Sequence, residues 1–196
     1  RWPGTIAPGT ISNELMSHND WVPTLCALAG EPDIVGKCLK GYDDHAGHTY
    51  KVHLDGYDQS KFLTAVTGSA GRNNGVHSAR DNFYYSDDDG MLVALRLGDY
   101  KASFAEQRMP GTMGLWAEPF TTLRMTKLYN LMQDPFELAD ITSNTYWDWI
   151  MNHVPQVYQG MGGVMTFLAT FDEFPPRSVP PSFNPANMLE QKLREI

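Results

Sequence analysis

The sequence is short of cysteine and of positive charge, and it contains no long apolar run. Its two cysteines, Cys26 and Cys38, could form one disulfide, but they are too few for a zinc site, which typically takes four nitrogen or sulfur ligands. Lysine and arginine number 15 against 23 aspartate and glutamate residues, giving a net charge of −8. This excess argues against nucleic acid and anionic membranes as partners. No apolar run approaches the roughly 20 residues that span a bilayer.

The remaining composition is that of a globular protein. The chain has 196 residues, of which 42% are hydrophobic and 19% charged, enough for one domain or slightly more. It opens on Arg1 without an initiator methionine or a signal peptide. We therefore expect a portion of a larger protein rather than a complete one.

The first 30 residues predict a short strand followed by a helix. Residues 11–15 could pair as a strand. Asp20 is a good N-cap for a helix over residues 20–29, because its carboxylate can accept a bond from a free backbone N–H. Pro23 falls in the first turn, where its missing N–H costs little, and Gly30 ends the helix. All three residues are assigned structural roles.

The middle of the sequence predicts an antiparallel meander. Residues 31–52 have the composition of a loop, and a turn at 54–58 leads to a short helix over 59–66. Residues 69–80, rich in glycine and asparagine, predict a flexible loop. Strands are then expected at 83–85, 91–97, 100–104 and 127–131, and the turn Asp87-Asp88-Asp89-Gly90 is typical of a hairpin.

The last third predicts helices. Apolar residues at helical spacing run from Tyr146 to Tyr158, and Gly160, Gly162 and Gly163 are expected to break or kink the helix before residues 164–168. An extended proline-rich segment over 175–181 and a short helix over 185–193 follow. Together with the meander, these elements predict an α+β fragment.

Several blocks of the sequence resemble the sulfatase family, in particular the bacterial arylsulfatases. The resemblance covers essentially the whole chain and depends on the order and spacing of blocks that are individually weak. These blocks are R-W-P-G at 1–4, S-x-x-D-x-x-P-T-L-x-x-L-A-G at 17–30, L-D-G-x-D at 54–58, G-M-L-V-A-L-R-L-G-D-Y-K at 90–101, L-Y-N-L with D-P-x-E at 128–137, and the tail blocks 167–177 and 182–184.

The resemblance implies the C-terminal portion of a sulfatase with an alkaline-phosphatase-like fold. Residues 1–80 would end the main α/β domain, where Asp55 and Gly56 belong to a structural turn. Residues 81–196 would form the small C-terminal antiparallel sheet with covering helices and a tail. The implied partner is the N-terminal part of the same protein, and a periplasmic or exported location is implied too.

The implied reaction is hydrolysis of a sulfate monoester by a hydrated formylglycine, with calcium or another divalent cation binding the sulfate oxygens. Neither cysteine fits the C/S-x-P/A-S-R motif that yields formylglycine, and the family's metal carboxylates lie upstream of the R-W-P-G block. No catalytic residue and no metal ligand is therefore assigned here, and the isolated chain is expected to be inactive. Alternatives are a phosphate or phosphonate ester hydrolase of the same superfamily and a non-catalytic binding or packing module.

Two polar stretches could bind metal but are better explained as solvated loops. Asp43, Asp44, His45 and His48 lack a complete ligand set, and Asp87-Asp88-Asp89-Gly90 lacks the spaced carboxylates of a calcium loop.

Two residues are candidates for a substrate pocket. Trp116 lies in a long excursion, residues 106–122, between two expected strands, and such loops often carry recognition. Its indole could stack on an aryl group. His53, next to the L-D-G turn, is a candidate for the rim of the pocket. Plain packing is the alternative for both.

Overall fold

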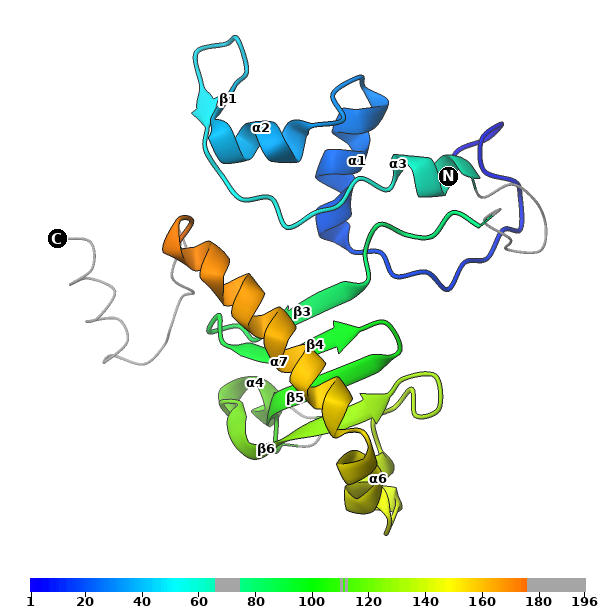
Figure 1. The fold of residues 1–196 in the computed structure, drawn as a ribbon, viewed down its shortest axis with the longest axis vertical. Helices are drawn as coiled ribbons and strands as arrows, with labels where there is room; N and C mark the ends of the chain where they lie inside the picture. Colours follow the sequence, from blue (N-terminus) through cyan, green and yellow to red (C-terminus); the bar gives the residue numbers. More distant parts are fainter. Residues whose placement is uncertain (66–74, 110, 112, 176–196) are drawn as a thin grey trace, which may run out of the picture. The chain divides into compact units, whose positions relative to one another are not determined.

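The computed structural model describes residues 1–65, 75–109, 111 and 113–175. These residues form two compact units, 1–81 and 82–196, shown in Figure 1. Each unit has its own secondary structure and its own buried residues. The first is mainly helical, and the second is a sheet covered by helices.

The described part of the first unit contains three α-helices and a small hairpin. A 3-10 turn, η1 (His18–Asp20), leads directly into α1 (Trp21–Leu28), and α3 (Ser60–Ala65) follows later. The left-handed backbone of Gly30 (φ +100°) ends α1. This turn lets the N–H of Gly30 donate to Ala27 O (3.1 Å) and that of Glu31 to Cys26 O (2.8 Å), which satisfies carbonyls that the helix end leaves free.

Residues 31–52 are not the loop that the sequence predicts. They contain α2 (Ile34–Lys40) and a hairpin of β1 (Tyr42–Asp43) with β2 (Thr49–Tyr50). Ile34 and Cys38, one helical turn apart, bury one face of α2. This apolar face is too short to give a clear periodic signal in the sequence.

The structure also answers one open question and corrects one expectation for the first unit. Both cysteines are free thiols, so the possible disulfide is not formed. Residues 11–15 form no strand, and Ile11 is exposed. Side chains take the place of a neighbouring strand here: Leu15 O accepts from Ser78 Oγ (2.6 Å) and Glu14 N–H donates to Ser12 Oγ (3.2 Å).

The second unit is built on the predicted antiparallel meander. Its strands are β3 (Asn82–Ser86), β4 (Leu92–Leu97), β5 (Tyr100–Glu106) and β6 (Thr121–Asn130), in the order β3-β4-β5-β6. The tight turns at Gly90 and Gly98 use left-handed backbone, which glycine adopts without steric cost. β6 begins six residues earlier than expected, at Thr121, where it pairs with Glu106 at the end of β5.

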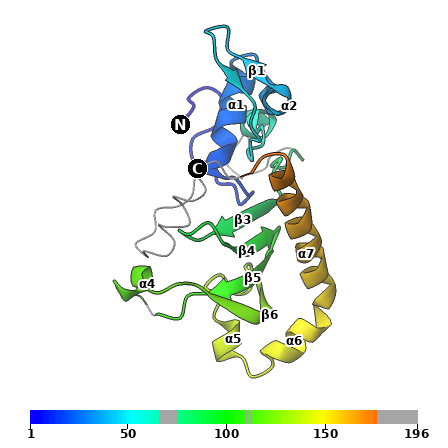
Figure 2. The same ribbon diagram turned by 90° about the vertical axis from the view of Figure 1, so that its left-hand side faces the viewer.

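Helices cover this sheet, as Figures 1 and 2 show. Between β5 and β6 lies α4 (Gly114–Ala117); after β6 come α5 (Ala139–Thr142), α6 (Tyr146–Asn152), α7 (Val154–Ala169) and the 3-10 turn η2 (Thr170–Asp172). The expected helix at 185–193 and all but the start of the proline-rich segment lie outside the described residues.

The three glycines do not break α7, contrary to expectation. The helix continues through all of them, and two allow it to approach the sheet closely. A Cβ on Gly160 would lie 3.7 Å from the Cβ of Ala102, and one on Gly163 would lie 3.2 Å from Leu95. Tertiary packing therefore overrides the low helix propensity of glycine.

The core of the second unit lies where α6 meets the sheet. Its fully or nearly buried members are Ala102, Leu128, Tyr129, Tyr146 and Ile150. The hydroxyl of Tyr146 donates to Leu128 O (3.0 Å) and accepts from Leu128 N–H (3.1 Å). Because β6 is an edge strand, this one side chain satisfies two backbone groups that would otherwise be buried without a partner.

Candidate functional site

A buried polar cluster of the first unit surrounds Asp20. Its carboxylate is completely buried and forms an ion pair with Arg80, whose side chain is 4% exposed. The guanidinium contacts both carboxylate oxygens, with Nε at 3.1 and 3.0 Å and Nη2 at 2.6 Å. The carboxylate also accepts from the backbone N–H of Ser17 (2.8 Å) and Tyr57 (2.9 Å), and from Gln59 Nε2 (3.3 Å).

The structure corrects the capping role expected for Asp20. The residue stands at the N-cap position of α1, but its side chain makes no capping bond to that helix. The reason is that η1 precedes α1 without a break, so Asp20 is already helical (φ −71°, ψ −18°), whereas a capping residue is normally extended. Ser17 caps η1 instead, with Asp20 as its reciprocal partner.

The network holds the L-D-G turn against the start of α1. Arg80 Nη2 donates to Asp55 O (2.7 Å), and its guanidinium lies 4.7 Å from the centre of the Tyr57 ring. Gly56 sits where the two segments meet: a Cβ there would lie 2.1 Å from Asn19 O and 2.9 Å from Pro23. Only glycine fits this contact without a backbone shift.

A second buried bond set joins the same segments. The hydroxyl of Thr24 accepts from Gln59 N–H (2.9 Å). The side-chain oxygen of Gln59 accepts in turn from Ala79 N–H (3.0 Å) and Ser78 Oγ (3.1 Å). The sequence predicts a flexible loop over residues 69–80. The C-terminal end of that segment, including Ser78 and Ala79, is therefore held in place by hydrogen bonds to Gln59.

The charge state of Asp20 follows from these contacts. Burial alone would raise the pKa of the Asp20 carboxyl, but the hydrogen bonds from Arg80 and from the N–H groups of Ser17 and Tyr57 outweigh burial and lower it below its usual value. The carboxylate is thus ionised and fully paired. These contacts use it for structure, with no oxygen presented to a substrate.

His53 directly precedes the L-D-G turn that this network fixes. Its Nδ1 lies 3.0 Å from Asp55 Oδ1, and its side chain is 31% exposed. The carbonyl of Asp55 is held by Arg80, so the imidazole and its carboxylate partner are attached to a rigid turn. Such a pair can exchange a proton or donate a hydrogen bond to an anion.

Trp116 lies in the second unit, on the single turn of α4. Its side chain is 64% exposed, and its neighbours Met113 and Leu115 are exposed too. Gln107 Nε2 fixes the excursion by donating to Leu115 O (2.9 Å) and Glu118 O (2.7 Å). The indole is thus mostly exposed, and the two pocket candidates lie in different units.

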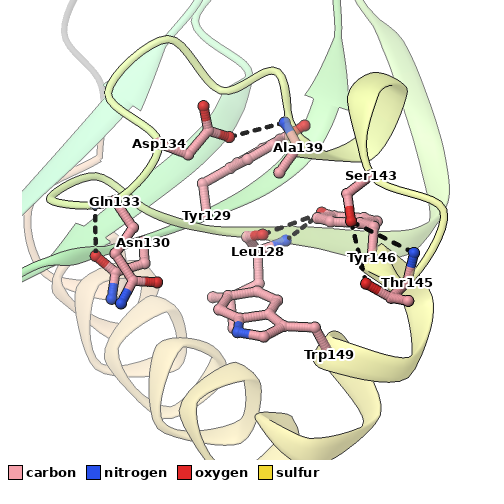
Figure 3. Close-up of a pocket in the computed structure, with 10 residues that line it drawn as sticks. All are labelled: Leu128, Tyr129, Asn130, Gln133, Asp134, Ala139, Ser143, Thr145, Tyr146 and Trp149. Atoms are coloured by element: carbon pink, nitrogen blue, oxygen red, sulfur yellow. Dashed lines mark hydrogen bonds between the residues drawn. The ribbon is translucent and has the colours of Figure 1, made fainter.

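A cavity of about 240 Å³ lies beside β6 and α6, drawn in Figure 3. Tyr129, Tyr146 and Trp149 line it together with the turn at Asp134, whose carboxylate accepts from Leu138 N–H (3.0 Å) and Ala139 N–H (2.8 Å). Burial, with nearby Asp140, raises the pKa of Tyr146 to about 12 and that of Tyr129 further. Both phenols are therefore neutral at physiological pH and act as packing and hydrogen-bonding groups.

In the polar stretch at 43–48, the Asp44 carboxylate bonds to groups of the same stretch. Asp44 accepts from the N–H of Ala46 (2.8 Å) and His48 (3.1 Å) and lies 3.0 Å from His48 Nδ1. Across the part of the chain that the structure describes, no three histidine, cysteine, aspartate or glutamate side chains gather in a way that could hold a metal ion.

The chain is similar to several arylsulfatases. Arylsulfatase A from Homo sapiens is 31% identical over 180 residues, or 87% of this chain and 30% of that protein. Arylsulfatase A from Bos taurus is 28% identical with the same two shares. An arylsulfatase from Hemicentrotus pulcherrimus is 35% identical over 55% of this chain and 15% of its own length. No protein-family model matches the sequence.

The fold agrees with these relatives. The crystal structure of PsFucS1 sulfatase from Pseudoalteromonas sp. superposes with a TM-score of 0.63 at 24% identity, covering 91% of this chain and 30% of that one. The chain belongs to the sulfatase family. It spans about 30% of the length of the arylsulfatase A relatives, and the species represented do not restrict this sulfatase segment to bacteria.

The sulfatase segment contains buried structural residues that the sequence pattern does not reveal. Arg80 and Gln59, both buried, carry the network around Asp20. Arg80 lies at the end of a polar stretch, 60 residues from its partner Asp20, so no local pattern marks it.

Among the described residues, no helix has both the length and the apolar character needed to cross a membrane.

Proposed function

We propose that the chain is the C-terminal part of a sulfuric ester hydrolase that cleaves sulfate monoesters. The observation that carries this proposal is the alignment with arylsulfatase A, which covers 87% of this chain but 30% of the relative. The remaining part of such a protein would carry the formylglycine nucleophile and would bind the divalent cation. Calcium is the expected ion. The superfamily's phosphate and phosphonate ester hydrolases are not favoured, because the named relatives are arylsulfatases.

The residues of this chain do not fit the nucleophile or the metal. Cys26 is followed by Ala-Leu-Ala and Cys38 by Leu-Lys-Gly, so neither matches the formylglycine motif. Cys38 is also buried, and burial raises the pKa of its thiol, which makes it a poor nucleophile. No catalytic step is therefore assigned to a residue of this chain.

Its proposed role is to complete the enzyme around the reaction centre. The network of Asp20 and Arg80 fixes the L-D-G turn, from which His53 would reach the rim of the substrate pocket. Trp116, exposed on α4, would contact the organic group of the ester. The partners would be the N-terminal part of the same protein and the sulfate ester, and we expect a periplasmic or otherwise exported enzyme.

The test compares the 196-residue chain with the longer protein read from the same gene. The longer protein, expressed with the formylglycine-generating enzyme, should release nitrophenol from nitrophenyl sulfate, and a chelator should abolish the release. The chain alone should release none. Activity of the isolated chain, or a preference of the longer protein for nitrophenyl phosphate, would contradict the proposal. A longer reading frame without the C/S-x-P/A-S-R motif would favour the non-catalytic packing module instead.

A further inference from the structure

The cavity beside β6 and α6 (Figure 3) is a site that the proposed function does not use. All of its lining residues come from one stretch of chain, 128–149, so the cavity is built within the second unit. Its volume is about 240 Å³, below the range of about 300–1,000 Å³ that drug-sized ligands occupy. A molecule with a single ring is accordingly the size of ligand that it can hold.

Aromatic side chains form the inner wall of the cavity. Tyr129 and Tyr146 are 6 and 2% exposed, and the Trp149 ring lies beside Tyr146, with centroids 6.3 Å apart and planes 23° apart. The His153 ring stacks on Trp149 at 4.2 Å, and its Nδ1 lies 2.8 Å from Trp149 O. The indole is therefore held in place by the protein itself, ready to pack against a flat ligand.

Polar side chains with unused hydrogen-bonding groups complete the lining. The side-chain oxygen of Asn130 accepts from two backbone N–H groups of its own turn (3.0 and 3.3 Å). Among the described residues, no hydrogen bond uses the amide nitrogens of the Asn130 and Gln133 side chains or the indole N–H of Trp149. Ser143 and Thr145 share one bond between their hydroxyls (3.2 Å), which leaves one hydroxyl hydrogen and an acceptor lone pair. The lining thus offers both donors and acceptors.

The charges around the cavity favour a neutral ligand. Among the described residues that line it, none is a lysine or an arginine, and Asp134 is the one carboxylate. Its two oxygens each accept from a backbone N–H, that of Leu138 (3.0 Å) and that of Ala139 (2.8 Å). An anion would therefore meet no cation here, and a cation would meet no free carboxylate. A sulfate or phosphate group is not the ligand that this lining recognises.

We propose that the cavity binds one neutral sugar ring. The C–H groups on a face of a pyranose pack on the electron-rich face of an aromatic ring such as Trp149. Its hydroxyls both donate and accept, which matches the mixed polar groups of Asn130, Gln133, Ser143 and Thr145. A plain aromatic molecule would pack on the same wall but would leave those groups without partners. The sugar site does not depend on the proposed sulfatase activity.

Saturation-transfer NMR on the full-length protein tests the sugar site. The unchanged protein should bind methyl galactopyranoside or methyl glucopyranoside with a dissociation constant in the millimolar range, because one ring makes few contacts. Trp149→Phe should weaken this binding about three- to tenfold, because the stacking surface is smaller. Gln133→Ala should weaken it about two- to tenfold through a lost hydrogen bond. The Gln133 side chain is exposed, so Gln133→Ala should keep the melting temperature.

Matched controls lie on α6 but outside the cavity. Trp147→Phe changes an indole that is 50% exposed and does not line the cavity. Asn152→Ala removes an exposed amide at the end of the same helix. Both variants should bind the glycosides as tightly as the unchanged protein does.

Four results would overturn the sugar site. They are no saturation transfer to either glycoside, equal binding by the unchanged protein and by Trp149→Phe and Gln133→Ala, displacement of the glycoside by equimolar phenol, and displacement by equimolar sulfate. The first result includes the case in which the rest of the full-length protein fills the cavity. A full-length protein that does not turn over nitrophenyl sulfate would contradict the proposed function and leave the glycoside titration standing.

Discussion

At the scale of single residues, Asp20 and Arg80 form a buried ion pair in the first unit. Removing one member of a buried ion pair leaves the other charge buried without a partner, which costs about 3–5 kcal/mol. In the full-length protein, Asp20→Ala should lower the free energy of unfolding by about that amount, measured by denaturant titration. The exposed Asp33, whose side chain does not cap α2, offers the control Asp33→Ala, with a change within about 0.5 kcal/mol.

The variant Arg80→Lys separates the contribution of charge to stability from the contribution of the guanidinium's hydrogen-bond geometry. A lysine ammonium can keep the charge but cannot bond both carboxylate oxygens and the Asp55 carbonyl in the fixed fork that Arg80 uses. Arg80→Lys should therefore recover less than half of the loss seen in Arg80→Ala. Full recovery would mean that charge alone is sufficient, and that the position of the L-D-G turn does not depend on the guanidinium.

Acid should weaken the same contact. The folded-state pKa of Asp20 lies below its ordinary value, so the unfolded chain binds this proton more readily. The stabilisation is present above the unfolded pKa, about 3.9, and is lost as pH falls through the folded pKa. Unfolding free energies between pH 7 and pH 2 should therefore fall less steeply in Asp20→Asn than in the unchanged protein. Equal slopes in the two proteins would remove Asp20 from the acid response.

At the scale of elements, Tyr146 is the link between α6 and the edge strand β6. Tyr146→Phe keeps the ring but leaves Leu128 N–H and C=O without their partner, and each unpaired buried group costs about 1–3 kcal/mol. The melting temperature of the full-length protein should fall accordingly. Tyr50→Phe, on the exposed hairpin, is the matched control and should have no measurable effect. An unchanged melting temperature in Tyr146→Phe would show that water replaces the phenol at β6.

The excursion between β5 and β6 should select the organic group of the substrate. Trp116 is 64% exposed, so Trp116→Ala should lower the melting temperature little. If its ring stacks on an aryl leaving group, a contact of about 0.5–1.5 kcal/mol, kcat/KM should fall several-fold for aryl sulfates but not for small alkyl sulfates. Leu115→Ala, one residue away on α4, controls for disturbance of the loop. Equal losses on both substrate types would assign Trp116 to packing.

Which elements could be predicted depends on whether their determinants are local. The meander follows from alternating strands and glycine turns, and the end of α1 from Gly30. The continuity of α7 could not be predicted, because Gly160 and Gly163 are tolerated only through contacts with β5 and β4. The setting of His53 could not be predicted either. The L-D-G turn is visible in the sequence, but Arg80, which fixes the turn, contacts Asp55 and Asp20, which lie 25 and 60 positions away.

At the scale of the whole molecule, α1 presents an apolar face that the described residues leave uncovered. Trp21, Val22, Leu25 and Leu28 are 44, 53, 58 and 42% exposed, and helical spacing places them along one side of the helix. If the chain is about 30% of a sulfatase, as its relatives indicate, the remaining part of that protein would cover the α1 face.

The isolated chain should therefore bind a hydrophobic dye much more strongly, per mole, than the full-length protein. The variant Leu25→Lys tests whether the dye binds to the exposed apolar face of α1. In the isolated chain it should reduce dye binding without loss of stability, because Leu25 faces water there. In the full-length protein the same change would bury an unpaired ammonium, and such a charge is expensive to desolvate, so the melting temperature should fall. A full-length protein that tolerates Leu25→Lys, or an isolated chain that remains monomeric and binds little dye, would mean that α1 faces solvent in both and that the missing part of the sulfatase docks elsewhere.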